Sequence, residues 1–368
     1  MNEITIDSSE IEEIMSGLLT PDEEASEDGS DSGCELWTLS SINDAYTSSI
    51  SPQRASEVST HRQHMSRIAD YIINNSDKIS GSRADWHNIW VRFSTDGDFI
   101  SSLALAEAGL RRFPCDAILL ADAINAAGQI GDWATGDRLV ERAESPDYRA
   151  DEDWRLAVYV ADYLCSKAHA QGLSDRVSTY ERALRFVREA IDRLPPNDHL
   201  INKEAEILID YGKVDEARGI LEGAIFRRDT IAEGVADPTR IPVPQCCLTY
   251  LEKILGDSCE YDTIIKIADA GIRFLKIAQT SVKVHYFFYR KALAMDGKIH
   301  MASGGAQTAN QDYVRNAMRT YAIAYALADP DEIRDTCRAN FLVLGVLGGI
   351  DDLKINAFCS SATDITSQ

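Results

Sequence analysis

The first 53 residues contain no lysine or arginine, although they hold thirteen aspartates and glutamates. The whole chain of 368 residues has a formal charge of -22, and the residues after position 53 contribute -9 of it, from 46 acids and 37 bases. Binding to nucleic-acid phosphates needs a surface patch rich in lysine and arginine. The charge therefore argues against direct nucleic-acid binding and against attachment to anionic membranes.

Long apolar runs and paired cysteines are also missing. The longest apolar stretch runs from Phe341 to Val346, whereas a membrane-spanning helix needs about 20 apolar residues. Met1 is followed by Glu3 and Asp7, where a signal peptide would be basic and then apolar. None of the eight cysteines belongs to a Cys-x-x-Cys pair. We therefore expect a cytoplasmic protein with no membrane partner, whose cysteines pack as small apolar residues.

Motifs for catalysis and cofactor binding are absent too. The sequence has no GxxxxGK[S/T], no GxGxxG after a strand pattern and no GxSxG. His61 and His64 lie one helical turn apart, but two ligands fall short of the three or four that zinc needs. We therefore expect no enzyme activity, no catalytic residue, no cofactor and no metal site. An unrecognised enzyme that uses a solenoid as its frame is the alternative.

What the sequence does have is a period of 34 residues. The residues that keep this period are Trp86, Leu120 and Trp154, Gly97 and Gly131, and Phe99 and Trp133. A fixed period of about 20–50 residues is typical of stacked supersecondary units. Apolar residues at helical spacing stand on both sides of each glycine, and Pro114 and Pro146 stand near the ends of the second helices. Each unit is therefore predicted to be a helix, a tight turn and a second helix.

This pattern resembles the tetratricopeptide repeat (TPR) family. The match is best for Trp86, Gly97, Phe99 and Pro114, and again around Gly212, with weaker matches over roughly residues 83–328. The resemblance implies an all-α fold, a right-handed α-solenoid of stacked antiparallel helix pairs. It implies a concave groove, lined mainly by the first helix of each pair, that binds a protein or peptide. It implies no particular chemistry.

The repeats also depart from the family pattern, and the chain divides into three predicted parts. The small-residue position late in the first helix holds Trp90 and Ile124, and the third unit carries an insertion near 165–178. Residues 53–346 are predicted to form the helical-repeat domain with its capping helices. The C-terminal tail, 347–368, is predicted to be weakly structured.

The third part is an acidic arm, residues 1–52. A segment so rich in Ser, Asp, Glu and Gly is predicted to be mostly disordered, because it cannot bury enough apolar area. A short amphipathic helix is predicted at 10–19, and it is expected to dock its apolar face in a groove. The residues of that face are Ile11, Ile14, Met15, Leu18 and Leu19. A helix without a partner is the alternative.

The predicted binding residues occupy the groove-facing positions of the first helices. They are His87, Val91, Asn125, Arg155, Tyr159, Asn202 and Glu206. Family members that clamp a C-terminal carboxylate use lysine and asparagine there, and the lysine is missing, so a carboxylate clamp is not expected. A mixed polar groove for a peptide or helix is predicted. An ordinary solvated face is the alternative.

The predicted function is that of a non-catalytic scaffold or adaptor in protein–protein interaction. Its groove would bind a peptide or helix of a partner, or the chain's own 11–19 segment. The alternative is a regulatory or inhibitor subunit that switches an effector enzyme or transcription factor, with the acidic arm mimicking nucleic acid. Strong salt sensitivity of a complex would favour the alternative.

Overall fold

The computed structural model describes residues 55–145, 148, 153–226, 244–277, 283–301, 310–328 and 333–347. Within these residues the chain has fourteen α-helices, one π-helical segment and no strand, so the predicted all-α class is confirmed. The predicted acidic arm, with its helix at 10–19, lies outside the described residues, as does the tail from residue 348 on. Handedness of the stack stays a prediction.

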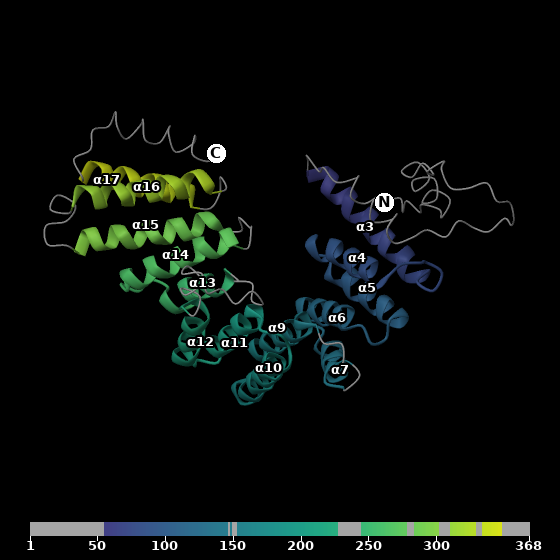
Figure 1. Cartoon of the computed structure of the whole chain (residues 1–368). Helices are drawn as coiled ribbons and strands as arrows, with labels where there is room; N and C mark the ends of the chain where they lie inside the picture. The colour runs from purple at the N-terminus through teal and green to yellow at the C-terminus, as the bar shows by residue number, and fades with distance from the viewer. Residues whose placement is uncertain are drawn as a thin grey trace. The chain divides into compact units, whose positions relative to one another are not determined.

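The chain folds into two compact units, which meet in sequence between Thr179 and Tyr180. The helices of the first unit are α3 (Ala55–Asn74), α4 (Arg83–Thr95), α5 (Phe99–Arg112), α6 (Ala117–Ile130), α7 (Trp133–Ala143) and α9 (Trp154–Ala170) (Figure 1). Helix α10 (Leu173–Arg193) spans the boundary. In the first unit α4 packs on α5, α5 on α6, and α6 on both α7 and α9.

Local sequence sets where these helices begin and turn. Ser82 caps α4 through a reciprocal capping box, and the Asp98 and Asp116 side chains accept hydrogen bonds from the first backbone N–H groups of α5 and α6. Gly97 and Gly131 have φ values of +76° and +72°, the left-handed region that favours glycine. The predicted helix, glycine turn and helix are therefore confirmed for both pairs, α4–α5 and α6–α7.

The 34-residue period holds for two pairs and slips at the third. Trp86 and Leu120 are each the fourth residue of their helix and are buried. Trp154 is instead the first residue of α9 and is only partly buried, because the capping residue Asp153 follows Asp116 by 37 positions. The equivalence of Trp154 with the two earlier residues is therefore wrong, although its helix exists.

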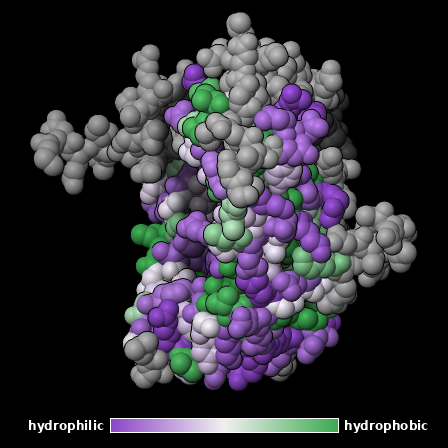
Figure 2. Space-filling view, turned by 90° about the vertical axis from the view of Figure 1, so that its left-hand side faces the viewer, coloured by the Kyte–Doolittle hydropathy of each residue, from purple (hydrophilic) through white to green (hydrophobic). Residues whose placement is uncertain are grey.

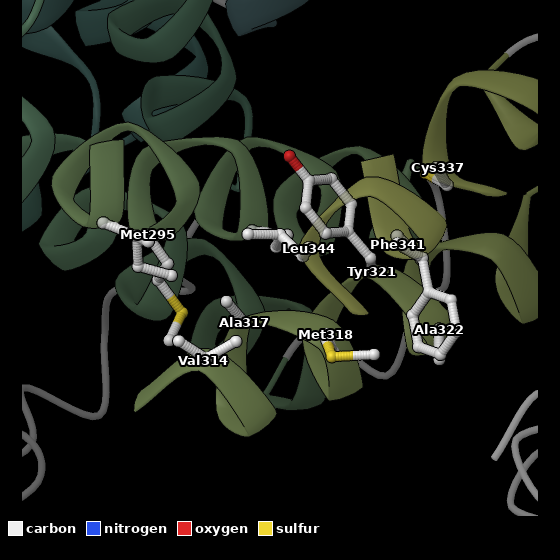
Figure 3. Packing of buried hydrophobic residues seen from close by; sticks show 12 residues of the cluster. Met295, Val314, Ala317, Met318, Tyr321, Ala322, Cys337, Phe341 and Leu344 are labelled. Carbon is white, nitrogen blue, oxygen red and sulfur yellow. The ribbon is translucent and has the colours of Figure 1, made fainter. Parts of the chain in front are cut away.

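The second unit continues as a chain of neighbouring helices. They are α11 (Asp198–Asp210), α12 (Val214–Phe226), α13 (Gln245–Thr249), the π-helical η2 (Tyr250–Leu255), α14 (Tyr261–Ile277), α15 (Val284–Met301), α16 (Gln311–Leu327) and α17 (Arg334–Leu347). Helices α14 to α17 pack in order, each on the next. Met295, Met318, Tyr321 and Phe341 belong to the core that joins α15, α16 and α17 (Figure 3).

Two expectations need correction. The sequence pattern predicts a helix at 281–295 and a polar connector that begins at residue 297, but the helix continues to Met301 as α15. Ile299 is buried, and the Lys298 ammonium lies 2.5 Å from an Asp262 carboxylate oxygen, so these residues are held in the helix. Among the described cysteines, Cys115 and Cys259 are exposed rather than packed inside.

Figure 2 views the molecule from the side on which α14 to α17 lie in Figure 1; the described residues on this side are mainly hydrophilic, with separate hydrophobic patches. Within the described residues, no helix combines the length and apolar character needed to cross a lipid bilayer.

Candidate partner-binding surface

A buried carboxylate joins the first two helix pairs of the repeat. Asp122 of α6 is fully buried, and its Oδ2 lies 2.8 Å from Nδ1 of His87 on α4. Its other oxygen, Oδ1, is buried without a hydrogen-bond partner. Burial raises the pKa of Asp122 to about 6, and the hydrogen bond to Asp122 raises the pKa of His87. Both side chains of the pair therefore hold their protons to higher pH than they would in the unfolded chain.

Trp90 links the His87–Asp122 pair to α9, which is the first helix of the third helix pair. Its ring stacks on that of His87 at a centroid distance of 6.0 Å and tilts against Tyr159 of α9 at 6.4 Å. The Trp90 side chain is buried, and its indole N–H has no hydrogen-bond partner. Trp90 occupies a position where the family pattern has a small residue, so the departure builds an aromatic contact across α4 and α9.

Arg155 supplies positive charge beside the pair. Its guanidinium lies 3.2 Å from the Asp153 carboxylate and 5.3 Å from the centre of the Trp154 ring. The charge of Arg155 acts to lower the pKa values of both His87 and Asp122. One turn further along α9, burial raises the pKa of the Tyr159 hydroxyl.

We call this set of side chains the A-helix surface. Its members are His87, Trp90, Asp122, Arg155 and Tyr159. Three of the seven predicted binding residues belong to it. Val91, exposed to 37%, and the half-buried Asn125 lie one turn further along α4 and α6 from His87 and Asp122. The surface offers an aromatic edge, a guanidinium and an imidazole, over a buried carboxylate.

The two remaining predicted residues lie on α11 in the second unit. Asn202 is buried and donates a 3.1 Å hydrogen bond to Glu206. Glu206 also pairs with Lys203 at 2.5 Å and accepts a long hydrogen bond from Thr249 of α13. These contacts tie α11 to α13, so the polar groups of Asn202 and Glu206 serve the packing of their own unit.

Sequence reasoning assigned neither Asp122 nor Trp90 to the binding surface. In the sequence Asp122 stands between Ala121 and Ala123 and has the appearance of a solvent-facing residue. Its spacing of 35 residues from His87, nearly one repeat, is the signal that two adjacent first helices would bring them together. Trp90 stands out in the sequence as a departure from the family pattern on the apolar face of its helix, and the structure confirms that it is buried.

A second hollow lies in the other unit, between the turn after η2 and α15. This cavity of about 280 Å³ is lined by Tyr261, Arg290, Asp296 and His300, among others. In it, Arg290 donates to the Gly256 carbonyl, and Asp296 lies 3.1 Å from the His300 imidazole. No predicted binding residue lines this cavity, whereas three belong to the A-helix surface, which is therefore the candidate site.

The sequence matches no protein-family model and no curated protein. Among the described residues, no group of three or more His, Cys, Asp or Glu side chains lies close enough to hold a metal ion.

Proposed function

We propose that this chain is a TPR-like, non-catalytic adaptor whose A-helix surface binds a segment of a partner protein. The observation that carries the proposal is the meeting of side chains from three first helices, α4, α6 and α9. Repeat arrays bind partners through surfaces built in this way from successive units. Localisation in the cytoplasm and membership of the TPR family belong to the same proposal.

The chemistry of the surface defines the segment that it fits. Arginine and tyrosine are among the residue types that contribute most at protein interfaces, because they combine apolar area with directed hydrogen bonds. Arg155 suits a carboxylate, and Tyr159 with His87 offers ring edges to an apolar side chain. A segment with one acidic and one large apolar residue a turn apart meets both needs.

The chain's own residues 11–19 have this composition. They carry Glu12 and Glu13 beside an apolar face that includes Leu18. An occupant from the same chain would be displaced by a partner segment of similar chemistry. The proposal therefore includes the 11–19 segment as one occupant of the surface.

The test is selection of peptides on the intact chain. A display library of 15-residue peptides is selected on the immobilised protein, and affinities of the enriched peptides are measured by fluorescence anisotropy. Arg155→Ala and Tyr159→Ala are each expected to weaken binding by about tenfold or more, which corresponds to about 1.4 kcal/mol. A synthetic peptide of residues 8–22 is expected to compete.

The matched control is Arg185→Ala, an exposed arginine of α10. It removes the same charge outside the surface and is expected to leave peptide affinity unchanged. Enriched peptides whose affinity is the same for wild type, Arg155→Ala and Tyr159→Ala would show that the A-helix surface is not the binding site.

A further inference from the structure

A second face of the first unit carries a cluster of arginines. Between α5 and α7 lies a pocket of about 260 Å³. The side chains that line it are Glu107, Leu110, Arg111, Arg138, Leu139 and Arg142. Leu110 and Leu139 are buried and form its apolar floor. The pocket therefore combines an apolar base with a rim of guanidinium groups.

The rim has more positive than negative charge. The Arg138 guanidinium lies 3.1 Å from the Glu107 carboxylate, which is the one acidic group among the residues that line the pocket. Arg142 donates a hydrogen bond to the Pro114 carbonyl, and Arg111 makes a long one to Ser76. None of these neutral acceptors cancels a charge. Three guanidinium groups thus face one carboxylate.

This excess is unusual in a chain of net charge -22. Planar guanidinium groups bind carboxylates through paired N–H donors, and clusters of arginines are the common means of recognising acidic segments. Among the N-terminal residues, the stretch 22–31 contains six acids and no base. They are Asp22, Glu23, Glu24, Glu27, Asp28 and Asp31. Pocket and segment therefore have complementary charge.

The length of chain between them suits an intramolecular contact. Arg112 of α5 donates hydrogen bonds to the carbonyls of Ser76 and Ile79, so the loop that follows α3 lies at the α5 end of the pocket. The other end of α3, Ala55, is about 30 Å away, the length of a 20-residue helix. Treated as a flexible chain, the 24 residues from Asp31 to Ala55 have an r.m.s. length of about 25–30 Å.

We propose that residues 22–31 bind the arginine pocket between α5 and α7 of the same molecule. A tether whose r.m.s. length matches the span gives an effective concentration in the millimolar range, so individually weak ion pairs suffice. The contact holds the acidic segment on the second helices of the repeat. It stands apart from the proposed function, because the A-helix surface lies on α4, α6 and α9.

The test follows cleavage of the acidic segment in the intact chain. A glutamate-specific protease cuts at Glu23, Glu24 and Glu27, and bound segment is protected. At low salt the double variant Arg111→Gln/Arg138→Gln is expected to be cut several-fold faster there than wild type, because both exposed arginines lose their charge. The matched control Arg185→Gln/Arg319→Gln removes two exposed arginines elsewhere and is expected to be cut at the wild-type rate. In about 0.5 M salt all rates are expected to converge.

A reciprocal variant tests the segment itself. Asp22→Asn/Asp28→Asn/Asp31→Asn keeps every glutamate cleavage site and is expected to speed cleavage as the arginine variant does. A synthetic peptide with the same three changes corrects for the intrinsic preference of the protease. When the arginine and the aspartate substitutions are combined, cleavage is expected to be no faster than with either set alone, because both sets remove the same contact.

Three results would overturn the proposal. Equal low-salt rates for wild type and the Arg111→Gln/Arg138→Gln variant would show that the pocket does not hold the segment. Additive effects of the two sets would show that they act at separate places. Protection that grows with protein concentration would show that the segment binds a second copy rather than its own chain.

Discussion

Nδ1 of His87 lies 2.8 Å from a carboxylate oxygen of Asp122, which is fully buried between the first helices of two successive pairs. Burial raises the pKa of Asp122 from 3.8 to about 6, and the hydrogen bond raises that of His87 above 6.5. The folded chain therefore binds more protons than the unfolded chain at both groups. The free energy of unfolding must fall as pH rises through this range.

The first prediction is a loss of stability with rising pH that depends on Asp122. Its contribution declines between about pH 4 and 6, and that of His87 declines as pH rises through its raised pKa. Asp122→Asn keeps an oxygen that accepts from His87 and removes the buried charge. The free energy of unfolding of the variant relative to wild type is expected to rise from pH 5 to pH 8, by on the order of 1–1.5 kcal/mol from the Asp122 shift alone.

Urea unfolding followed by tryptophan fluorescence checks this, because all five tryptophans precede Thr179. The control is Asp132→Asn. Hydrogen bonds to Thr135 lower the pKa of Asp132, so its contribution to stability is lost only as pH falls through acidic values. A stability difference between Asp122→Asn and wild type that is constant from pH 5 to pH 8 would contradict the prediction.

The second prediction concerns the close approach of Gly136 to Tyr163. A Cβ atom on Gly136 would lie 2.1 Å from the Tyr163 ring, whose hydroxyl is held by the Trp133 carbonyl at 2.8 Å and by Asp137 at 2.9 Å. The ring cannot move without breaking these bonds. Gly136→Ala is therefore expected to lower the free energy of unfolding by about 1–3 kcal/mol, as overpacking does.

Gly219→Ala is the matched control for this change. Gly219 also lies inside a helix, α12, and an added Cβ there would meet no atom within 4 Å. That substitution is expected to raise the free energy of unfolding by about 0.5–1 kcal/mol, because alanine favours a helix over glycine. Thermal unfolding by circular dichroism measures both; a Gly136→Ala protein as stable as wild type would refute the close approach.

The sequence predicts the turns well because a turn glycine is a local feature. Gly97, Gly131 and Gly212 were all expected to form turns, and each has a φ between +72° and +86°. The predicted helices also agree with the structure where the apolar residues of a segment fall on one face of a helix. The extension of α15 to Met301 could not be predicted, because it goes with the burial of Ile299 in a core shared with α16 and α17.

The candidate site was predicted in part for a similar reason. His87, Arg155 and Tyr159 stand at positions where the repeat pattern alone places them on the first helices. Asp122 depends on tertiary packing: its carboxylate is buried because α4 covers it, and no local pattern distinguishes it from a solvated aspartate. The π-helical turn at Tyr250–Leu255 is likewise invisible in a 3.6-residue period.

The third prediction separates backbone strain from steric contact. Gly131 has a φ of +72°, and a Cβ there would meet the Trp133 ring at 3.8 Å, an ordinary contact. Gly131→Ala is therefore expected to cost about 1 kcal/mol from the left-handed backbone alone. Gly131→Asn should recover part of this loss, because asparagine tolerates that conformation. Urea unfolding by tryptophan fluorescence measures both, and equal losses for alanine and asparagine would contradict the explanation.

The fourth prediction concerns Phe341, which attaches the last described helix to the second unit. Its buried ring packs with Met318 and Tyr321 in the core of α15, α16 and α17 (Figure 3). Phe341→Ala is expected to lower local stability by about 3–5 kcal/mol, because it leaves a cavity in that core. Hydrogen exchange should then quicken at the amides of α16 and α17. Val343→Ala, a change of an α17 residue that is 52% exposed, should leave exchange nearly unchanged. Equal exchange in the two variants would show that α17 is not held through Phe341.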